Sequence, residues 1–169
     1  YEISQANPKD FSVKEVSPEQ VLEEAKKRNV KIISYTYTDP IIFYEYMMDI
    51  AKLAKKQNIK NTIVSNGFIN PEPLKQLCRY LDGANIDLKS ISDEFYRENC
   101  GARVQPVLDS LKILKQENVW LEITNLLIPT LNDSEKEIKE LVLWIKENLG
   151  ENVPLHFTAF YPCYKLSHL

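Results

Sequence analysis

Apolar and polar residues along the chain fall into two alternating patterns, one typical of strands and one typical of amphipathic helices. The strand-like segments are short and rich in β-branched and aromatic residues. They cover residues 30–37, 60–66, 83–89, 119–128 and 153–160. The helix-like segments carry apolar residues three and four positions apart, which predicts one buried face. They cover residues 17–28, 39–54, 71–80, 104–117 and 134–149.

Residues that favour helix ends support these boundaries. Ser and Asn are good N-caps because their side-chain oxygens accept hydrogen bonds from free backbone N–H groups. The predicted N-caps are Ser17, Asn70, Ser92 and Ser134. Glu137, three residues after Ser134, completes a predicted capping box. Gly150 predicts the end of the same helix.

The order of the segments predicts an α/β fold. Strands separated by helices form parallel βα units, and right-handed crossovers then lead either to a doubly wound sheet or to a barrel. The 169 residues, 44% of them hydrophobic, are enough for one domain with a substantial core. Neither GxGxxG nor GxxxxGK[ST] occurs, so the sequence contains no dinucleotide fingerprint and no P-loop.

Charge and hydropathy narrow the range of partners. The net charge is -3, from 21 basic and 24 acidic residues, and no basic stripe contains interleaved aromatic residues. We therefore expect no nucleic-acid partner. No apolar run approaches the roughly 18 residues of a membrane span, and no signal-peptide layout opens the sequence. A cytoplasmic location without membrane association is the expectation.

The three cysteines, Cys78, Cys100 and Cys163, are far apart in the sequence. They form neither a CxxC pair nor a CxxxCxxC run, so no metal or cluster ligands are predicted among them. An odd and sparse cysteine count is typical of a reducing compartment and argues against a disulfide framework. Each cysteine is therefore interpreted as a partly buried thiol.

Polar residues gather at the carboxyl ends of the predicted strands. In parallel βα folds these ends share one rim, where ligands bind. A role in a helix cap or a turn explains any single one of these polar residues. Their presence at the ends of all five strands, however, favours a binding site. They are Thr36, Thr38 and Asp39, then Ser65 and Asn66, Asp87 and Lys89, Thr124 and Asn125, and finally Thr158 and Tyr161.

Five segments, taken in order, resemble radical S-adenosylmethionine (SAM) enzymes. They read YTYTDP, VSNGF, NIDLKSISDEFYRENCGARVQPVLDSLK, LLIPTLNDS and FYPCYKL. The resemblance is greatest to the AmmeMemoRadiSam branch, which is related to pyruvate formate-lyase activating enzyme. It implies a partial TIM-like barrel of six βα units, with the five strands here as the second to the sixth. Residues 1–169 are then expected to form a single radical SAM core domain without its first unit.

In this family a CxxxCxxC loop binds a four-iron four-sulfur cluster that holds SAM. One-electron reduction then cleaves SAM to methionine and a 5′-deoxyadenosyl radical, which takes a hydrogen atom from the substrate. Tyr1 to Gln5 resembles the segment that follows the last cluster cysteine, so we expect the ligands to precede this chain. The parent protein is expected to be a glycyl-radical-activase-like enzyme, whereas this chain alone is not expected to be catalytic.

The resemblance also implies partners. They are an electron donor such as flavodoxin or ferredoxin, an unidentified substrate that could be a protein, and Memo and AMMECR-type proteins. A cluster-less, non-catalytic module that binds SAM or a protein is the alternative. A third alternative, which the motifs favour least, is a barrel lyase in which Lys89 forms a Schiff base.

The resemblance assigns the first two strand ends to the cofactor. Asp39 aligns with the acidic residue that binds the SAM ammonium group, a charge-assisted contact. Thr36 and Thr38 lie on the same rim, and Ser65 and Asn66 align with a segment beside the SAM methionine. The alternatives are that Asp39 only caps the following helix and that Asn66 only forms a turn with Gly67.

Asp87 and Lys89 are the strongest site candidates. Alternation puts both on one face of the third strand, with Ile86 and Leu88 facing the helices. The resemblance assigns Asp87 to the SAM ribose and Lys89 to the methionine carboxylate. The alternative is a buried ion pair between the two side chains.

The last two strands contribute the remaining predictions. Ile128 belongs to the segment that contacts the adenine in the family, and Thr124 and Tyr161 are assigned to the substrate side. Thr130, Ala159 and Tyr161 depart from the residues usual in the family, which leaves the substrate open. His156, a single histidine within a strand, is interpreted as structural.

Overall fold

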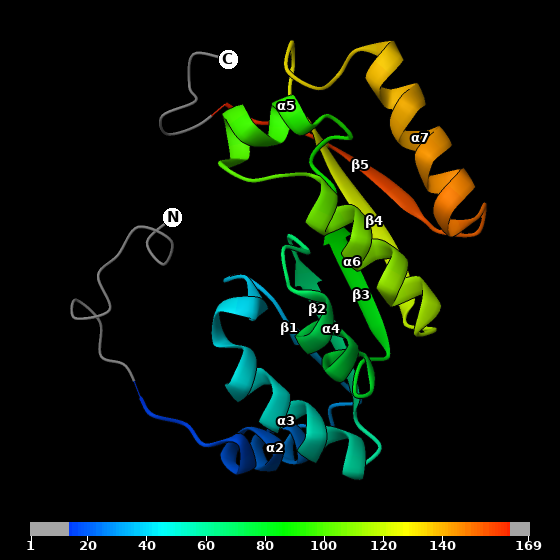
Figure 1. Ribbon diagram of the computed structural model, residues 1–169. Coiled ribbons are helices and arrows are strands. Elements are labelled where there is room, and N and C mark those ends of the chain that lie inside the picture. The colour runs from blue at the N-terminus through cyan, green and yellow to red at the C-terminus, as the bar shows by residue number, and fades with distance from the viewer. Residues whose placement is uncertain (1–13, 163–169) are drawn as a thin grey trace.

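The structure is a computed structural model and describes residues 14–162. Its centre is a sheet of five parallel strands in the order β1-β2-β3-β4-β5 (Figure 1). The strands are β1 (Ile32–Tyr35), β2 (Lys60–Ser65), β3 (Gly83–Asp87), β4 (Trp120–Leu127) and β5 (Leu155–Ala159). The predicted α/β class is therefore confirmed, and sequential strands are neighbours in the sheet.

Helices separate the strands and pack on the sheet. Their bounds are α2 (Pro18–Lys27), α3 (Tyr44–Lys56), α4 (Pro71–Cys78), α5 (Asp93–Phe95), α6 (Gln105–Gln116) and α7 (Glu135–Leu149). A 3₁₀ turn over Pro40–Phe43 precedes α3, and a π-helical turn over Tyr96–Cys100 follows α5. In Figure 1, α4 and α6 lie in front of β2 and β3.

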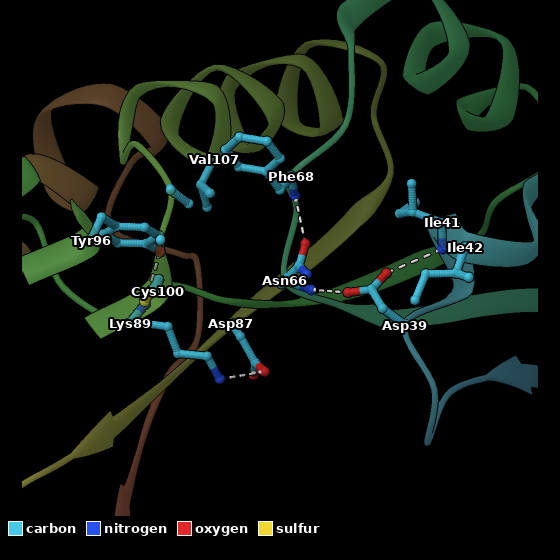
Figure 2. Close-up of a pocket in the computed structure, with 12 residues that line it drawn as sticks. Asp39, Ile41, Ile42, Asn66, Phe68, Asp87, Lys89, Tyr96, Cys100 and Val107 are labelled. Atoms are coloured by element: carbon cyan, nitrogen blue, oxygen red, sulfur yellow. Dashed lines mark hydrogen bonds and ion pairs between the residues drawn. The ribbon is translucent and has the colours of Figure 1, made fainter. Parts of the chain in front are cut away.

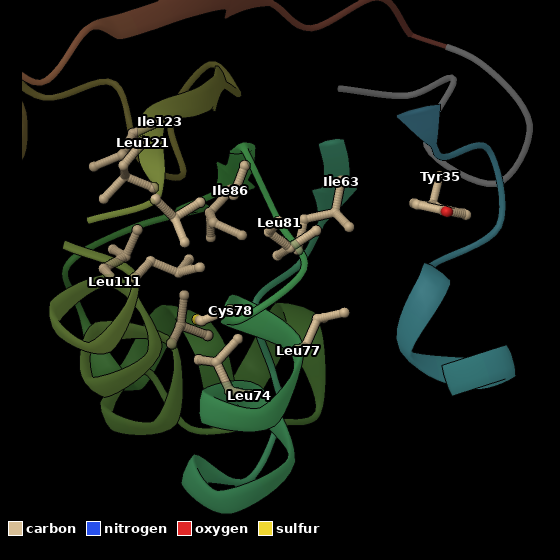
Figure 3. Packing of buried hydrophobic residues seen from close by; sticks show 14 of the residues in the cluster. Tyr35, Ile63, Leu74, Leu77, Cys78, Leu81, Ile86, Leu111, Leu121 and Ile123 are labelled. Carbon is tan, nitrogen blue, oxygen red and sulfur yellow. The ribbon is translucent and has the colours of Figure 1, made fainter. Parts of the chain in front are cut away.

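The hydrophobic core lies between the sheet and these helices. Alternate strand residues such as Ile63, Ile86 and Ile123 are almost fully buried. They pack with helix residues including Leu74 and Leu111, as Figure 3 shows. Burial of these aliphatic side chains is the main favourable contribution to folding.

The opposite face of the sheet is polar and partly open to solvent. The Ser34 and Thr62 hydroxyls lie 2.7 Å apart across β1 and β2. Thr124 Oγ1 donates to Asn85 Oδ1 at 2.9 Å across β4 and β3. A doubly wound sheet carries helices on both faces, whereas a barrel encloses one face of its sheet. Among the described residues only one face carries helices, which favours the barrel alternative.

Differences from the predictions concern the ends of the elements. Every strand is shorter than its apolar segment, and β3 ends at Asp87 rather than at Lys89. Asn70 occupies the N-cap position of α4, but its side chain makes no capping hydrogen bond, so that part of the prediction was wrong. Ser17 and Ser92 do cap their helices.

The predicted capping box of α7 forms only in part. Ser134 Oγ accepts from the Glu137 backbone N–H at 3.3 Å, as expected. The Glu137 carboxylate, however, accepts from the Ser134 hydroxyl at 2.6 Å rather than from the Ser134 backbone. In α2 the reciprocal box between Ser17 and Gln20 is complete.

None of the helices within residues 14–162 is long and apolar enough to span a membrane.

Candidate functional site

The candidate site begins at Asp39, which joins the ends of β1 and β2. Its Oδ1 accepts from the Ile41 backbone N–H at 3.1 Å and from Ser65 Oγ at 3.0 Å. Its Oδ2 accepts from the Asn66 backbone N–H at 2.8 Å. Asp39 therefore does cap the following turn, but it does not only cap it, because the same carboxylate also bonds Ser65 and Asn66. These bonds also orient the predicted residues Ser65 and Asn66 around the same carboxylate.

The loop after β2 is shaped by Asn66 and Gly67. Asn66 Oδ1 accepts from the Phe68 backbone N–H at 2.8 Å, and Ser65 Oγ accepts from the Gly67 N–H at 3.1 Å. Gly67 has a φ of +72°, a conformation that side chains other than that of glycine adopt at a cost. The predicted Asn-Gly turn is thus present, and it brings Phe68 to the rim.

Asp87 and Lys89 form an ion pair at the end of β3. Lys89 Nζ lies 2.7 Å from Asp87 Oδ2, and the two side chains retain 35% and 30% of their exposure. The pair expected as the structural alternative therefore exists, but it is accessible to solvent rather than buried. Ile86 and Leu88 are buried against the helices, as the alternation predicted.

Three buried side chains hold the backbone of Lys89. The Tyr96 hydroxyl accepts from the Lys89 N–H at 3.1 Å. Asn132 Nδ2 donates to the Lys89 carbonyl at 2.7 Å, and Asn125 Nδ2 donates to the Leu88 carbonyl at 2.7 Å. Burial raises the pKa of Tyr96 well above its usual value, so its hydroxyl remains protonated and neutral. These bonds fix the backbone of Leu88 and Lys89, the two residues that follow the last residue of β3.

These groups surround two cavities on the rim. The first, of about 520 Å³, has Asp39 and Asn66 on one side and Tyr96 and Cys100 on the other, with Phe68 near its top (Figure 2). The second cavity, of about 270 Å³, lies along the ends of β1, β2 and β3. The predicted site residues that line it are Thr36, Thr38, Asp39, Ser65, Asn66, Asp87 and Lys89.

Five other predicted residues, Thr124, Asn125, Ile128, Thr158 and Tyr161, do not line these two cavities. Thr124 lies beside Asp87 in the sheet and donates to Asn85. Ile128 packs partly against the core, and its backbone N–H donates to Asn132 Oδ1 at 2.7 Å. Tyr161 is 83% exposed beyond β5. The polar groups of the first three strands converge, whereas those of the last two do so only in part.

Several rim residues were missed by sequence reasoning. Asn132 belongs to a polar turn, and its contacts with Lys89 join segments 43 positions apart. Tyr96 and Phe68 look like ordinary core residues in the sequence. Asn125 was among the polar strand-end residues. Alternation, however, directs its side chain away from the open face of the sheet and towards the helices, and there it is buried. Only tertiary contacts reveal these roles.

His156, interpreted from the sequence as structural, joins β5 to β4 through a side-chain contact. Its imidazole Nε2 lies 2.9 Å from Glu122 Oε2 on the open face of the sheet, and its side chain is 49% exposed. Trp120 Nε1 donates to the other oxygen, Glu122 Oε1, at 3.0 Å. The hydrogen bonds from Trp120 and His156 lower the pKa of Glu122, which keeps it ionised at neutral pH.

The described residues do not provide a site for an iron–sulfur cluster. Within residues 14–162 no group of three or more potential ligands is arranged to hold a metal ion. Thiolates are the ligands of such clusters, yet burial raises the pKa of Cys78 to about 11 and that of Cys100 in the same direction. Cys163 lies outside the described residues, as do Tyr1 to Gln5 and the end of FYPCYKL.

Comparison with known proteins agrees with the fold. The sequence matches the Radical SAM superfamily over residues 4–142. The chain belongs to this superfamily. Its five parallel strands and single helical layer are then those of the partial TIM-like barrel that the resemblance implied.

Individual relatives support the same assignment. The uncharacterized protein MJ0808 of Methanocaldococcus jannaschii is 39% identical over 165 residues, covering 98% of this chain and 49% of that protein. The pyruvate formate-lyase-activating enzyme of Clostridium pasteurianum is 25% identical over 139 residues, covering 79% of this chain and 58% of that protein. The chain thus spans about half the length of these relatives.

A solved structure has a similar fold. A domain of the pyruvate-formate lyase-activating enzyme from Bacteroides vulgatus superposes with a TM-score of 0.61 at 21% identity, covering 73% of this chain and 74% of that domain. At this identity the similarity concerns the fold alone. The homology to activating enzymes comes from the sequence comparison.

Proposed function

We propose that this chain is the SAM-binding core of a radical SAM enzyme of the AmmeMemoRadiSam branch. The observation that carries the proposal is the convergence of the predicted residues of β1, β2 and β3 on one rim cavity. The superfamily supplies the chemistry, which is reductive cleavage of SAM. Asp39, Asp87 and Lys89 are the charged groups on this rim.

The charges of the rim complement those of SAM. The methionine part of SAM carries an ammonium and a carboxylate, and we assign the carboxylate to Lys89 and the ammonium to Asp39. Lys89 has three N–H donors and uses one on Asp87, so it can bind a ligand carboxylate without losing the ion pair. The Asp39 carboxylate already accepts hydrogen bonds from three neighbouring groups, and these bonds fix its orientation before a ligand binds.

The remaining parts of the site follow from the predicted roles. We assign Thr36, Thr38, Ser65 and Asn66 to the methionine end, Asp87 to the ribose and Ile128 to the adenine. Thr124 and Tyr161 are assigned to the substrate side. The four-iron cluster requires thiolates that the described residues do not bring together, so its ligands must come from outside residues 14–162.

We infer partners from the activating-enzyme relatives. A pyruvate formate-lyase-activating enzyme acts, by its name, on another enzyme. We therefore propose a protein substrate, a flavodoxin or ferredoxin as electron donor, and Memo and AMMECR-type proteins as associated partners. A cytoplasmic location is part of this proposal.

Anaerobic reconstitution of the full-length gene product with iron and sulfide tests the proposal. We expect an iron–sulfur EPR signal after reduction, heat of binding with SAM in calorimetry, and formation of 5′-deoxyadenosine. The substitution Lys89→Gln should weaken SAM binding, whereas Lys139→Gln on the exposed face of α7 should not. No heat with SAM would contradict the proposal.

One observation favours a second candidate, a SAM-binding module without cluster chemistry. The described cysteines, buried Cys78 and exposed Cys100, are far apart in the sequence, and no group of three or more potential ligands forms within residues 14–162. Heat of SAM binding without an EPR signal or 5′-deoxyadenosine would identify such a module. The lyase alternative gains no support, because the Lys89 ammonium is engaged with Asp87.

A further inference from the structure

A second polar cluster lies on the open face of the sheet, outside the proposed cofactor residues. It consists of Trp120, Glu122 and His156, from β4 and β5. The Glu122 carboxylate binds the Trp120 indole N–H through one oxygen and the His156 imidazole through the other, at 3.0 and 2.9 Å. A carboxylate held from both sides on an accessible surface is fixed in orientation and can still interact with a ligand.

Strand register locates the cluster relative to the rim. Asp87, Thr124 and His156 are consecutive partners across β3, β4 and β5, so they form one row on the open face. Asn85 and Glu122 form the next row, two residues further from the rim, which corresponds to about 7 Å along the strands. A molecule that reaches from Asp87 along this face therefore meets the cluster.

The chemistry of the cluster favours a cation. Glu122 can only accept hydrogen bonds while ionised, so His156 Nε2 carries the proton of the bond between them. The ionised Glu122 carboxylate keeps further lone pairs for a ligand, and an acceptor with a negative charge selects positively charged donors.

Trp120 adds a surface that cations prefer. Its side chain is 64% exposed, an unusual state for so large an apolar group. Its neighbour on β3 is Gly83, which has no side chain to cover the indole. The face of an indole attracts ammonium groups, and the bond to Glu122 keeps the ring beside the carboxylate.

We propose that Trp120, Glu122 and His156 form a subsite for a positively charged amine of the substrate. The inference rests on the proposed function, because it takes the rim beside Asp87 as the cofactor position. The amine would pair with the Glu122 carboxylate and lie against the Trp120 indole. The rest of the substrate would then extend from this amine along the open face towards Thr124 and the rim.

A small ammonium ion can test this subsite without knowledge of the substrate. The full-length gene product, labelled with ¹³C and ¹⁵N at histidine, is titrated with n-butylammonium and followed by the His156 ring signal, which the variant His156→Gln identifies. We expect a saturable shift with butylammonium and none with butyrate, which has a similar size and the opposite charge.

Variants decide between this subsite and general surface binding. Glu122→Gln should weaken butylammonium binding by at least about tenfold, because it removes the charge but little volume. Glu135→Gln, at an exposed carboxylate of α7, should leave it unchanged. If Glu122→Gln does not fold, Trp120→Leu at an exposed position provides the same comparison.

The outcomes separate this inference from the proposed function. Loss of the butylammonium shift in Glu122→Gln with unchanged heat of SAM binding supports the subsite. The absence of a saturable shift, or an equal shift in Glu122→Gln or with butyrate, would overturn it. If SAM does not bind to the wild-type protein while butylammonium does, the proposed cofactor site fails but the amine site remains.

Discussion

At the scale of residues, Asn132 shows how one side chain secures the candidate site. It is 4% exposed, and its amide bonds the Lys89 and Leu126 carbonyls and the Ile128 N–H. Asn132→Ala would leave the partly buried Leu126 carbonyl and Ile128 N–H without this partner, and the Lys89 carbonyl with only the 3.2 Å bond from Asn125 Nδ2. We expect the free energy of unfolding to fall by about 3 kcal/mol, measured by urea denaturation.

Asn148→Ala is the matched control for this prediction. Asn148 is exposed on α7, and its side chain makes a hydrogen bond to the Trp144 carbonyl. Surface changes of this kind are usually within about 0.5 kcal/mol. An equal loss of stability in the two variants would mean that the bonds of Asn132 contribute nothing specific. We also expect Asn132→Ala to weaken SAM binding, because Lys89 loses its fixed backbone.

Asp93 provides a prediction about pH. Its carboxylate accepts from the Val104 N–H at 3.1 Å and pairs with Arg97 and Arg103 at 2.9 and 3.2 Å. The backbone hydrogen bond from Val104, followed by Arg103 and Arg97, lowers the pKa of Asp93 in the folded state. A lowered folded pKa contributes stability above the unfolded value of about 4, and the contribution is lost as pH falls below it.

Asp93→Asn should therefore be less stable than wild type at pH 7, and the difference should shrink between about pH 4 and pH 2. Urea denaturation of the wild type and the variant, at pH 7 and at both ends of the acidic range, measures the free energies of unfolding to be compared. Glu135→Gln, which removes an exposed carboxylate paired with Lys139, should change stability little at pH 7. A gap for Asp93→Asn that is independent of pH would contradict the prediction.

At the scale of elements, Gly67 sets the close packing of the loop after β2. A Cβ at this position would lie 2.8 Å from Ile86 Cγ2 and 3.4 Å from Val107 Cγ1, and its φ is +72°. Ile86 belongs to β3 and Val107 to α6, so the loop is confined between two elements. Gly67→Ala should reduce the free energy of unfolding by about 2–4 kcal/mol, from backbone strain and overpacking together.

Gly101 separates these two causes. Its φ is +61°, close to that of Gly67, but a Cβ there would meet no atom within 4 Å. Gly101→Ala should therefore cost only the conformational strain, about 1–2 kcal/mol. Thermal or chemical unfolding of the two variants gives the comparison. Equal effects would show that the contacts with Ile86 and Val107 are not limiting.

At the scale of the whole molecule, ligand binding should couple the strand ends to global stability. A ligand that binds only the folded state at 100 times its Kd raises the free energy of unfolding by about 2.7 kcal/mol. We expect SAM to do so for the full-length gene product in differential scanning fluorimetry. The double variant Asp87→Asn with Lys89→Gln should lose most of this effect.

A second ion pair provides the control for this experiment. Asp49 and Lys52 pair at 3.2 Å on α3, and both side chains are exposed. Asp49→Asn with Lys52→Gln should retain the stabilisation by SAM. If the two double variants respond to SAM in the same way, the Asp87–Lys89 pair does not bind the cofactor.

The positions and order of the strands and helices were largely predictable from the sequence because their determinants are local. Runs of β-branched residues, N-caps such as Ser17 and Ser92, and the glycine after the last helix indicate each element without reference to its neighbours. Strand ends were less predictable. Leu88 still donates its N–H to the Thr124 carbonyl of β4. The Leu88 carbonyl and the Lys89 N–H, however, bond to the side chains of Asn125 and Tyr96, although the local pattern continues that of β3.

The sequence by itself determined the elements, their parallel order and the polar strand ends, because periodicity and turn chemistry are encoded within a few residues. Tertiary structure alone decided that Asp39 bonds the end of β2, that Asn132 holds Lys89, and that His156 pairs with Glu122. These contacts join residues 27 to 43 positions apart. Only the register of the sheet and the packing of its loops bring such residues together.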